Sequence, residues 1–130
     1  MGDQVVMLRQ YRLTLDTQIL EVPAGTRREE ESWADCAQRE LREETGYRAG
    51  KWHDLGRVWP APGITDEVMA VYLASELTPD PLPADVDEEI ELVPMPLDVV
   101  IAMAVDGRLQ DAKSIVGILR TAAYLNKSLS

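Results

Sequence analysis

One segment in the first half of the chain carries local signals of an amphipathic helix, and it constrains the fold more than any other part of the sequence. Ser32 is a preferred N-cap residue, and Gly46 is a typical residue just past a helix C-terminus. Between them, apolar side chains recur every four residues and share one helical face: Trp33, Ala37 and Leu41. The pattern predicts a helix between residues 32 and 46 whose apolar face, Trp33 included, packs in the core.

The same segment also gathers acidic side chains on one face. On a helix, Glu40 lies one turn from both Glu43 and Glu44. Carboxylates this close repel one another unless a cation neutralises them, and a ligand set made only of oxygen favours Mg²⁺ or Mn²⁺ over zinc. Taken alone, such a cluster is more often a solvated, charged helix face than a metal site.

The net charge limits what the chain can bind. The 130 residues are 45% apolar and 28% charged, which is enough for one domain with its own core. However, 13 Lys and Arg against 23 Asp and Glu leave a net charge of −10, which repels nucleic acid and anionic membrane surfaces. A phosphate ester would therefore need to be bound through a cation held by the carboxylates.

The remaining sequence favours a soluble, cytoplasmic protein. Cys36 is the single cysteine, so an internal disulfide is excluded, and no apolar run has the length of a membrane span. Strands are expected at residues 5–10, 18–22, 52–59, 67–74 and 90–94, and further helices at 98–105 and 111–125. Because these elements do not alternate regularly, the predicted class is α+β or an α/β sandwich.

The full spacing around the acidic helix resembles the Nudix box, GX5EX7REUXEEXGU, where U is a bulky aliphatic residue. The chain matches it from Gly25 to Gly46 and departs only at Tyr47, which replaces the final aliphatic residue. The resemblance implies a Nudix α/β/α sandwich with a mixed central sheet. It also implies roles for the residues of the box: Glu40, Glu43 and Glu44 as metal ligands, Glu44 also as a catalytic residue, Gly25 at the substrate diphosphate, and Arg39 orienting the ligand carboxylates.

Two further stretches resemble the ADP-ribose pyrophosphatases and related nucleoside diphosphate sugar hydrolases of that family. They are LEVPAG at 20–25 and PAPGITDE at 60–67, and Pro62 falls fifteen residues after the box, where ADP-ribose hydrolases carry proline. The resemblance implies the following roles outside the box: Glu67 as a further metal ligand, Arg9 and Arg12 as phosphate contacts, Pro62 at the substrate, and Glu88, with Glu89 second, as the base that activates water.

These resemblances imply Mg²⁺- or Mn²⁺-dependent hydrolysis of a nucleoside diphosphate derivative, with ADP-ribose yielding AMP and ribose 5-phosphate. Alternatives are another nucleotide sugar, a damaged nucleoside triphosphate, or a ligand-sensing domain without catalysis. Residues 1–130 are expected to form a single domain that lacks the family's N-terminal segment, which relatives use for dimer exchange, so a homodimer stays possible. Trp52 and Trp59 are expected either to pack the sheet or to stack on a base.

Overall fold

The computed structural model describes residues 3–82 and 89–129. These residues form strands and helices in an order that matches the expected elements. The elements are β1 (Gln4–Arg12), β2 (Thr17–Glu21), α1 (Trp33–Thr45), β3 (Tyr47–Val58), β4 (Met69–Pro79), β5 (Ile90–Pro96), α2 (Leu97–Asp106) and α3 (Ala112–Tyr124).

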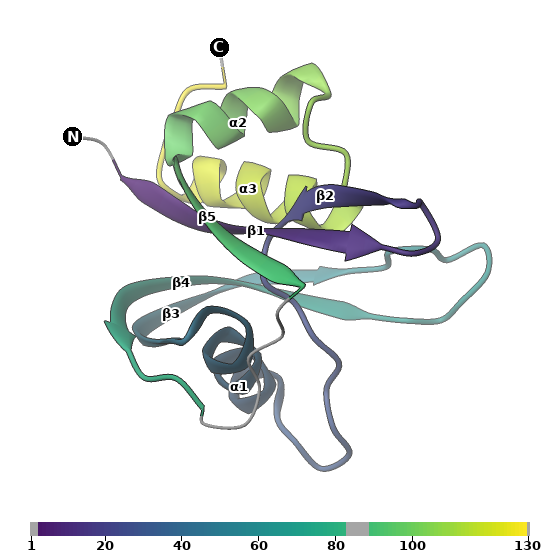
Figure 1. The fold of residues 1–130 in the computed structure, drawn as a ribbon, viewed down its shortest axis with the longest axis vertical. Coiled ribbons are helices and arrows are strands. Elements are labelled where there is room, and N and C mark those ends of the chain that lie inside the picture. The colour runs from purple at the N-terminus through teal and green to yellow at the C-terminus, as the bar shows by residue number, and fades with distance from the viewer. Residues whose placement is uncertain (1–2, 83–88, 130) are drawn as a thin grey trace.

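The strands form two sheets. β1 is the central strand of the first, with β2 on one side and β5 on the other, and β3 pairs with β4 in the second. Figure 1 shows α2 and α3 on one side of the sheets and α1 on the other, so the chain is layered as helix, sheet and helix. The short turn between β1 and β2 brings Leu8 opposite Glu21. This register places Glu21 at the end of β2, where the loop that leads to α1 begins.

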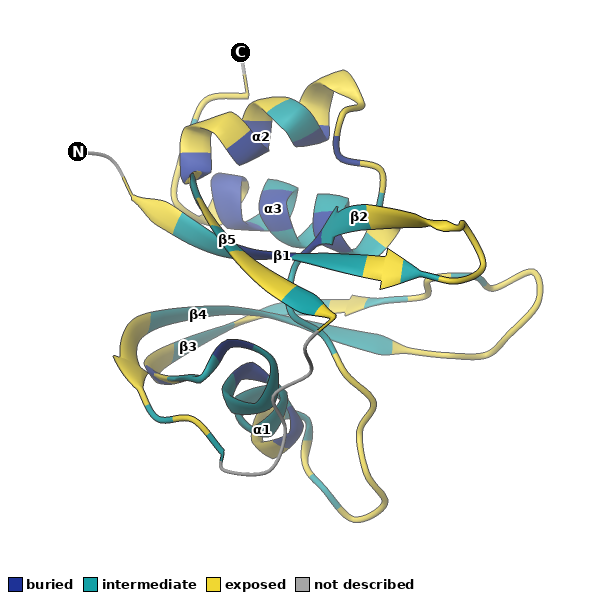
Figure 2. Cartoon of the chain, in the orientation of Figure 1, coloured by how far each residue is buried: buried dark blue, intermediate teal, exposed yellow. Residues whose placement is uncertain are grey.

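The main core lies between the three-stranded sheet and the two C-terminal helices. Met7 of β1 and Val100 of α2 are fully buried, and Ile118 of α3 is nearly so. Figure 2 shows the buried positions of α2 and α3 on the faces that the two helices turn toward each other and toward the sheet. None of the helices in residues 3–82 and 89–129 is both long and apolar enough to cross a membrane.

The predicted α/β class and the layered arrangement are confirmed. The expected sheet was mixed, with parallel as well as antiparallel pairs, and the described strands show only antiparallel ones. Every pair between described strands is antiparallel: β1 with β2, β1 with β5, and β3 with β4. β1 and β2 are joined by a tight turn, which permits only an antiparallel pair. The first sheet, α2 and α3 supply most of the core. α1 and the loop before it lie on the other side of the sheets from α2 and α3 (Figure 1).

Candidate active site

Local hydrogen bonds fix both ends of α1. The Ser32 hydroxyl oxygen accepts a hydrogen bond from the Asp35 backbone N–H at 3.0 Å, as an N-cap does. Gly46 adopts a left-handed conformation with φ of 75°, and its N–H donates to the Arg42 carbonyl at 3.0 Å. The predicted helix bounds are thereby confirmed. Glu40, Glu43 and Glu44 share the face of α1 that points toward the preceding loop.

Arg39 joins that loop to the helix. Its Nε and Nη2 donate to the two carboxylate oxygens of Glu31 at 2.8 and 2.9 Å, and Nη2 also reaches the Thr26 carbonyl at 3.1 Å. Its Nη1 donates to Glu40 at 2.7 Å and to Glu43 at 3.1 Å. One guanidinium therefore positions two of the three predicted metal ligands, Glu40 and Glu43, and holds the loop against them.

These contacts keep Glu31 and Arg39 charged. Hydrogen bonds from Arg39, followed by the Arg28 backbone N–H at 3.1 Å, lower the pKa of Glu31 to about 2. The hydrogen bond to Glu31 likewise raises the pKa of Arg39 above its usual value. Glu31 therefore closes the loop through Arg39, and its carboxylate stays ionised throughout the neutral range.

Glu44 has a different environment from its neighbours. Its carboxylate accepts the Ala24 backbone N–H at 2.9 Å, and within the described residues no Lys or Arg forms an ion pair with it. Burial raises its pKa to about 7, and the negative charge of Glu40 adds to this effect. Burial also raises the pKa of Glu40, although Arg39 partly offsets it. In the described part of the chain no ion pair therefore neutralises Glu44, and the charge of Lys113 only partly offsets the effect of burial on its pKa.

Gly25 lies against the carboxylate of Glu40. A Cβ atom at Gly25 would lie 1.9 Å from the Glu40 Cδ and 2.2 and 2.3 Å from its two oxygens. Any side chain at position 25 would therefore displace Glu40. Glycine allows the loop backbone and the acidic face of α1 to approach each other closely.

The carboxylates of Glu40, Glu43 and Glu44 are the kind of oxygen ligand that Mg²⁺ and Mn²⁺ prefer, although they do not yet converge on one point. In residues 3–82 and 89–129, no three Asp, Glu, His or Cys side chains converge as a metal-binding group. Glu40 and Glu43 instead face Arg39, and Glu44 faces the Ala24 N–H. All donors are carboxylate oxygens, and the raised pKa values of Glu40 and Glu44 show where added positive charge would be stabilising.

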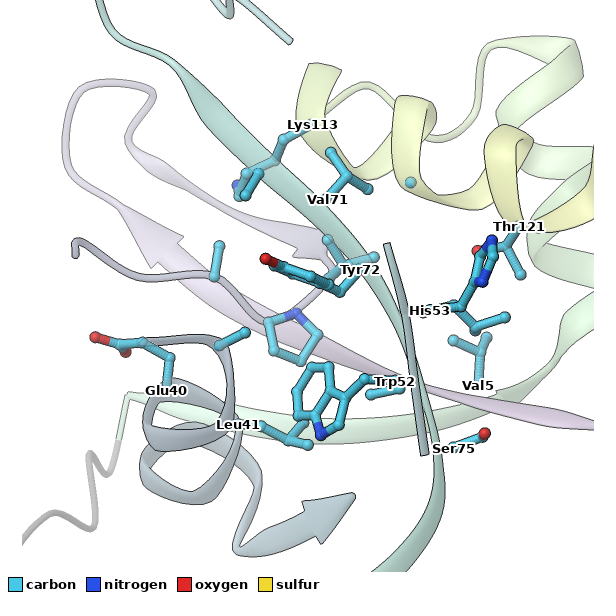
Figure 3. A pocket seen from close by; sticks show the side chains of 18 of the residues that line it. Val5, Glu40, Leu41, Trp52, His53, Val71, Tyr72, Ser75, Lys113 and Thr121 are labelled. Atoms are coloured by element: carbon cyan, nitrogen blue, oxygen red, sulfur yellow. The ribbon is translucent and has the colours of Figure 1, made fainter. Parts of the chain in front are cut away.

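A cavity of about 750 Å³ adjoins the acidic face, a size typical of small-molecule sites. Gly25 and Glu40 line it together with side chains of β3 and β4. Figure 3 shows Glu40 at one end and His53 at the other, with Trp52 and Tyr72 between them. The Trp52 and Tyr72 rings pack edge to face, with centroids 5.9 Å apart. A ligand held at Glu40 would therefore extend over an aromatic wall.

Comparison with known proteins identifies the family. Residues 1–115 match the sequence profile of the NUDIX domain. The chain belongs to the Nudix family. The fold agrees, since the Nudix chain matches a crystal structure of an ADP compounds hydrolase with a TM-score of 0.86 and 25% identity, over 97% of this chain and 68% of the other.

Several curated relatives support the same assignment. A methanol dehydrogenase activator of Bacillus methanolicus is 32% identical over 89% of this chain and 64% of its own length. An ADP-ribose pyrophosphatase of Bacillus subtilis (strain 168) is 33% identical over 88% of this chain and 63% of its own. A GDP-mannose pyrophosphatase of Yersinia enterocolitica is 32% identical over 86% and 63%. The Nudix chain thus spans less than two thirds of the length of these relatives.

The two arginines predicted to contact phosphate have different surroundings. Arg9 lies on β1 and pairs with Glu91 at 3.5 Å, where both side chains are largely exposed. Arg12 donates through Nε and Nη2 to both oxygens of Glu21 at 2.8 Å. Arg9 is therefore only weakly held, whereas the Arg12 guanidinium is oriented by a bidentate ion pair.

The other predicted site residues lie on loops. Pro62 is exposed in the loop between β3 and β4. Glu67 is also exposed, near the end of that loop, and it lines the same cavity as Glu40. Glu88 lies outside the described residues, and Glu89 is exposed in the turn before β5. The structure therefore brings Glu67 to the cavity of the box residues and makes no statement on Glu88.

Sequence reasoning missed a buried ionic network beside the loop between β2 and α1, residues 22–32, which we call the Nudix loop. Glu21 is only 2% exposed and pairs with Arg12 and with Lys113 of α3. Lys113 also pairs with Asp111 at 2.9 Å, and the neighbouring Ser114 hydroxyl accepts the Val22 N–H at 2.9 Å. The available signal was the glutamate in LEVPAG, a charged residue that follows two apolar residues, Ile19 and Leu20, at the end of β2.

The tryptophans also differ from expectation. Trp33 was predicted to lie in the core, but it is only half-buried, with the Arg27 guanidinium 4.4 Å from its ring centre. Helical phase places it correctly on the inner side of α1, yet the loop covers it with arginine instead of apolar side chains. Trp52 packs on Tyr72 at the cavity, whereas Trp59 is 71% exposed.

The raised pKa of Glu44 predicts a pH-dependent stability in metal-free protein. Because this pKa rises from 4.5 to about 7 on folding, the folded state binds the proton more tightly, and stability is lost as pH rises through that range. Glu44→Gln removes this loss. In EDTA, the Tm of the variant minus that of the unsubstituted protein should grow between about pH 5 and about pH 8. The exposed Glu29→Gln provides the charge-matched control, and a difference independent of pH for Glu44→Gln would contradict the assignment.

Proposed function

We propose that this chain hydrolyses the diphosphate linkage of nucleoside diphosphate derivatives with Mg²⁺ or Mn²⁺, and that its substrate is ADP-ribose, cleaved to AMP and ribose 5-phosphate. The observation that carries the proposal is the carboxylate face formed by Glu40, Glu43 and Glu44 beside a cavity of about 750 Å³. Similarity to proteins named ADP-ribose pyrophosphatase and ADP compounds hydrolase supports the substrate class.

The residues of the Nudix box divide the work between binding and orientation. Divalent cations, when bound, supply the charge that holds the diphosphate and stabilises the transition state of phosphoryl transfer. Glu40, Glu43 and Glu44 hold them, and Glu67 adds a carboxylate from the cavity edge. Arg39 keeps Glu40 and Glu43 aligned, a role for which its hydrogen bonds at 2.7 and 3.1 Å are suited.

Residues outside the helix contact the substrate. The Gly25 backbone lies beside Glu40, where a diphosphate would approach the cations. Arg12 contacts phosphate through Nη1, since Glu21 holds its Nε and Nη2. Arg9 adds a second, more mobile contact, and Pro62 shapes the loop over the substrate.

GDP-mannose is the second candidate substrate. The Yersinia enterocolitica relative named GDP-mannose pyrophosphatase is 32% identical, close to the 33% of the Bacillus subtilis ADP-ribose pyrophosphatase. Both compounds present the same diphosphate to the carboxylate face, so base and sugar contacts must separate them.

A substrate panel tests the proposal. Purified protein with Mg²⁺ or Mn²⁺ is supplied with ADP-ribose, GDP-mannose, other nucleotide sugars and an oxidised nucleoside triphosphate, and released monophosphates are measured after phosphatase coupling. ADP-ribose should show the highest kcat/KM, and products should be AMP and ribose 5-phosphate. Higher kcat/KM for GDP-mannose would select the second candidate. Turnover of triphosphates alone, or of no compound, would contradict diphosphate-derivative hydrolysis.

Glu88 supplies the general base in this proposal. Glu88→Gln should lower kcat by roughly 10² to 10⁴, the usual worth of a general base, while KM and the affinity for Mn²⁺ change little. Glu89→Gln, the neighbouring control, should retain most of its turnover. Full activity in Glu88→Gln, or a larger loss in Glu89→Gln, would assign the base to another residue.

A further inference from the structure

Next to the carboxylate face, arginine and aromatic side chains alternate along the edge of the cavity that Glu40 lines. The Arg27 Cζ lies 4.4 Å from the ring centre of Trp33. The Arg57 Cζ lies 5.5 Å from the ring centre of Trp33 and 5.9 Å from that of Tyr72. We refer to Arg27, Trp33, Arg57 and Tyr72 as the cation–aromatic row. It connects the Nudix loop to β3 and β4.

A bulge in β3 places Arg57 in this row. The register of β3 against β4 shifts between Asp54, opposite Tyr72, and Arg57, opposite Ala70, and Gly56 between them has φ of 93°. The extra residue turns Arg57 to the face that carries Tyr72. Asp54 then holds the Arg57 guanidinium at 3.0 Å, so Arg57 is both neutralised and fixed.

Arg27 differs from the other arginines near the site because no carboxylate among residues 3–82 and 89–129 forms an ion pair with it. Arg28 pairs with Glu43, Arg39 with three glutamates and Arg57 with Asp54. The Arg27 guanidinium instead donates a hydrogen bond to the Glu31 carbonyl at 3.2 Å. In a chain of net charge −10, this exposed guanidinium is a local centre of uncompensated positive charge.

Stacking on Trp33 gives that charge a defined position. A guanidinium on an aromatic face keeps its N–H groups directed outward in its own plane, where they can bind phosphate oxygens. Arg27 and Trp33 line the same cavity as Gly25 and Glu40. The guanidinium therefore lies along the wall of the cavity that receives the substrate in the proposed function.

We propose that Arg27, positioned by Trp33, binds a phosphoryl group of the substrate diphosphate directly. This inference rests on the proposed function and adds a contact made by the protein to those made through cations. Arg27 thereby sets affinity for the diphosphate, and Trp33 is a positioning residue that acts through Arg27. The alternative is that Arg27 and Trp33 only pack against each other, in which case their substitution changes stability and leaves KM unchanged.

Steady-state kinetics with ADP-ribose and Mg²⁺ distinguish a phosphoryl contact by Arg27 from packing alone. Arg27→Met should raise KM about tenfold to a hundredfold, the usual cost of a charge-assisted hydrogen bond, with kcat within about threefold. Arg27→Lys should recover part of the loss because it keeps the charge without the planar stack. Arg108→Met, an exposed arginine paired with Asp106, is the matched control and should leave KM unchanged.

A double-variant comparison tests the role of Trp33. Trp33→Leu should raise KM less than Arg27→Met, and the double variant should be no worse than Arg27→Met alone, because Trp33 acts through Arg27. Additive losses in KM would overturn that dependence. If Trp33→Leu does not fold, Trp33→Phe, which keeps an aromatic face, should instead retain a KM near that of the unsubstituted protein, and a KM as high as that of Arg27→Met would overturn the role of Trp33.

The outcomes distinguish this inference from the function on which it rests. Active enzyme with the same KM in Arg27→Met, whatever its Tm, overturns the phosphoryl contact and leaves the function standing. If the unsubstituted protein turns over none of the compounds, calorimetry with ADP-ribose and with inorganic pyrophosphate in Ca²⁺ still decides the contact. Weaker binding by Arg27→Met supports it, whereas equal binding, or none by either protein, overturns it.

Discussion

The ion pairs of Arg39 are the interaction on which the rest of the site depends. Its guanidinium and its three carboxylate partners, Glu31, Glu40 and Glu43, are all 15–18% exposed at the side chain, so the group is largely removed from water. At such depth unpaired charges are costly, and removal of one partner leaves the others without compensation. Because Arg39 also holds the Thr26 carbonyl, the same contacts close the loop over α1.

Positive charge within the protein is nevertheless insufficient for this cluster. Arg39 serves three carboxylates, and Glu44 depends on one backbone N–H, with burial raising its pKa to about 7. Gly25 then brings the loop within contact of the Glu40 carboxylate, which leaves no room for a further side chain there. A diphosphate would add more negative charge at this point. Divalent cations would resolve both deficits, and in the proposed function they are the means by which a chain of net charge −10 accommodates an anionic substrate.

The parts of the site that sequence could predict are those set by local spacing. The Ser32 and Gly46 caps determine α1 within one turn, and helical geometry then places Glu40, Glu43 and Glu44 together. The Glu21 network was not predictable in this way, since Glu21 meets Lys113 only after β2 registers against β1 and α3 docks, 92 residues away. Trp33 shows a second limit: helical phase gives its direction, but the arginines that cover it come from the loop and from the β3 bulge.

The central claim is that the acidic face of α1 binds divalent cations, and Mn²⁺ binding measured by electron paramagnetic resonance tests it without turnover. Titration of the unsubstituted protein should remove free Mn²⁺ from solution, and Mg²⁺ should compete. Glu43→Gln should weaken binding by at least about tenfold, the effect expected when one charged ligand is lost, whereas the exposed Glu29→Gln should bind as the unsubstituted protein does. Equal Mn²⁺ affinity in Glu43→Gln and in the unsubstituted protein would contradict the claim.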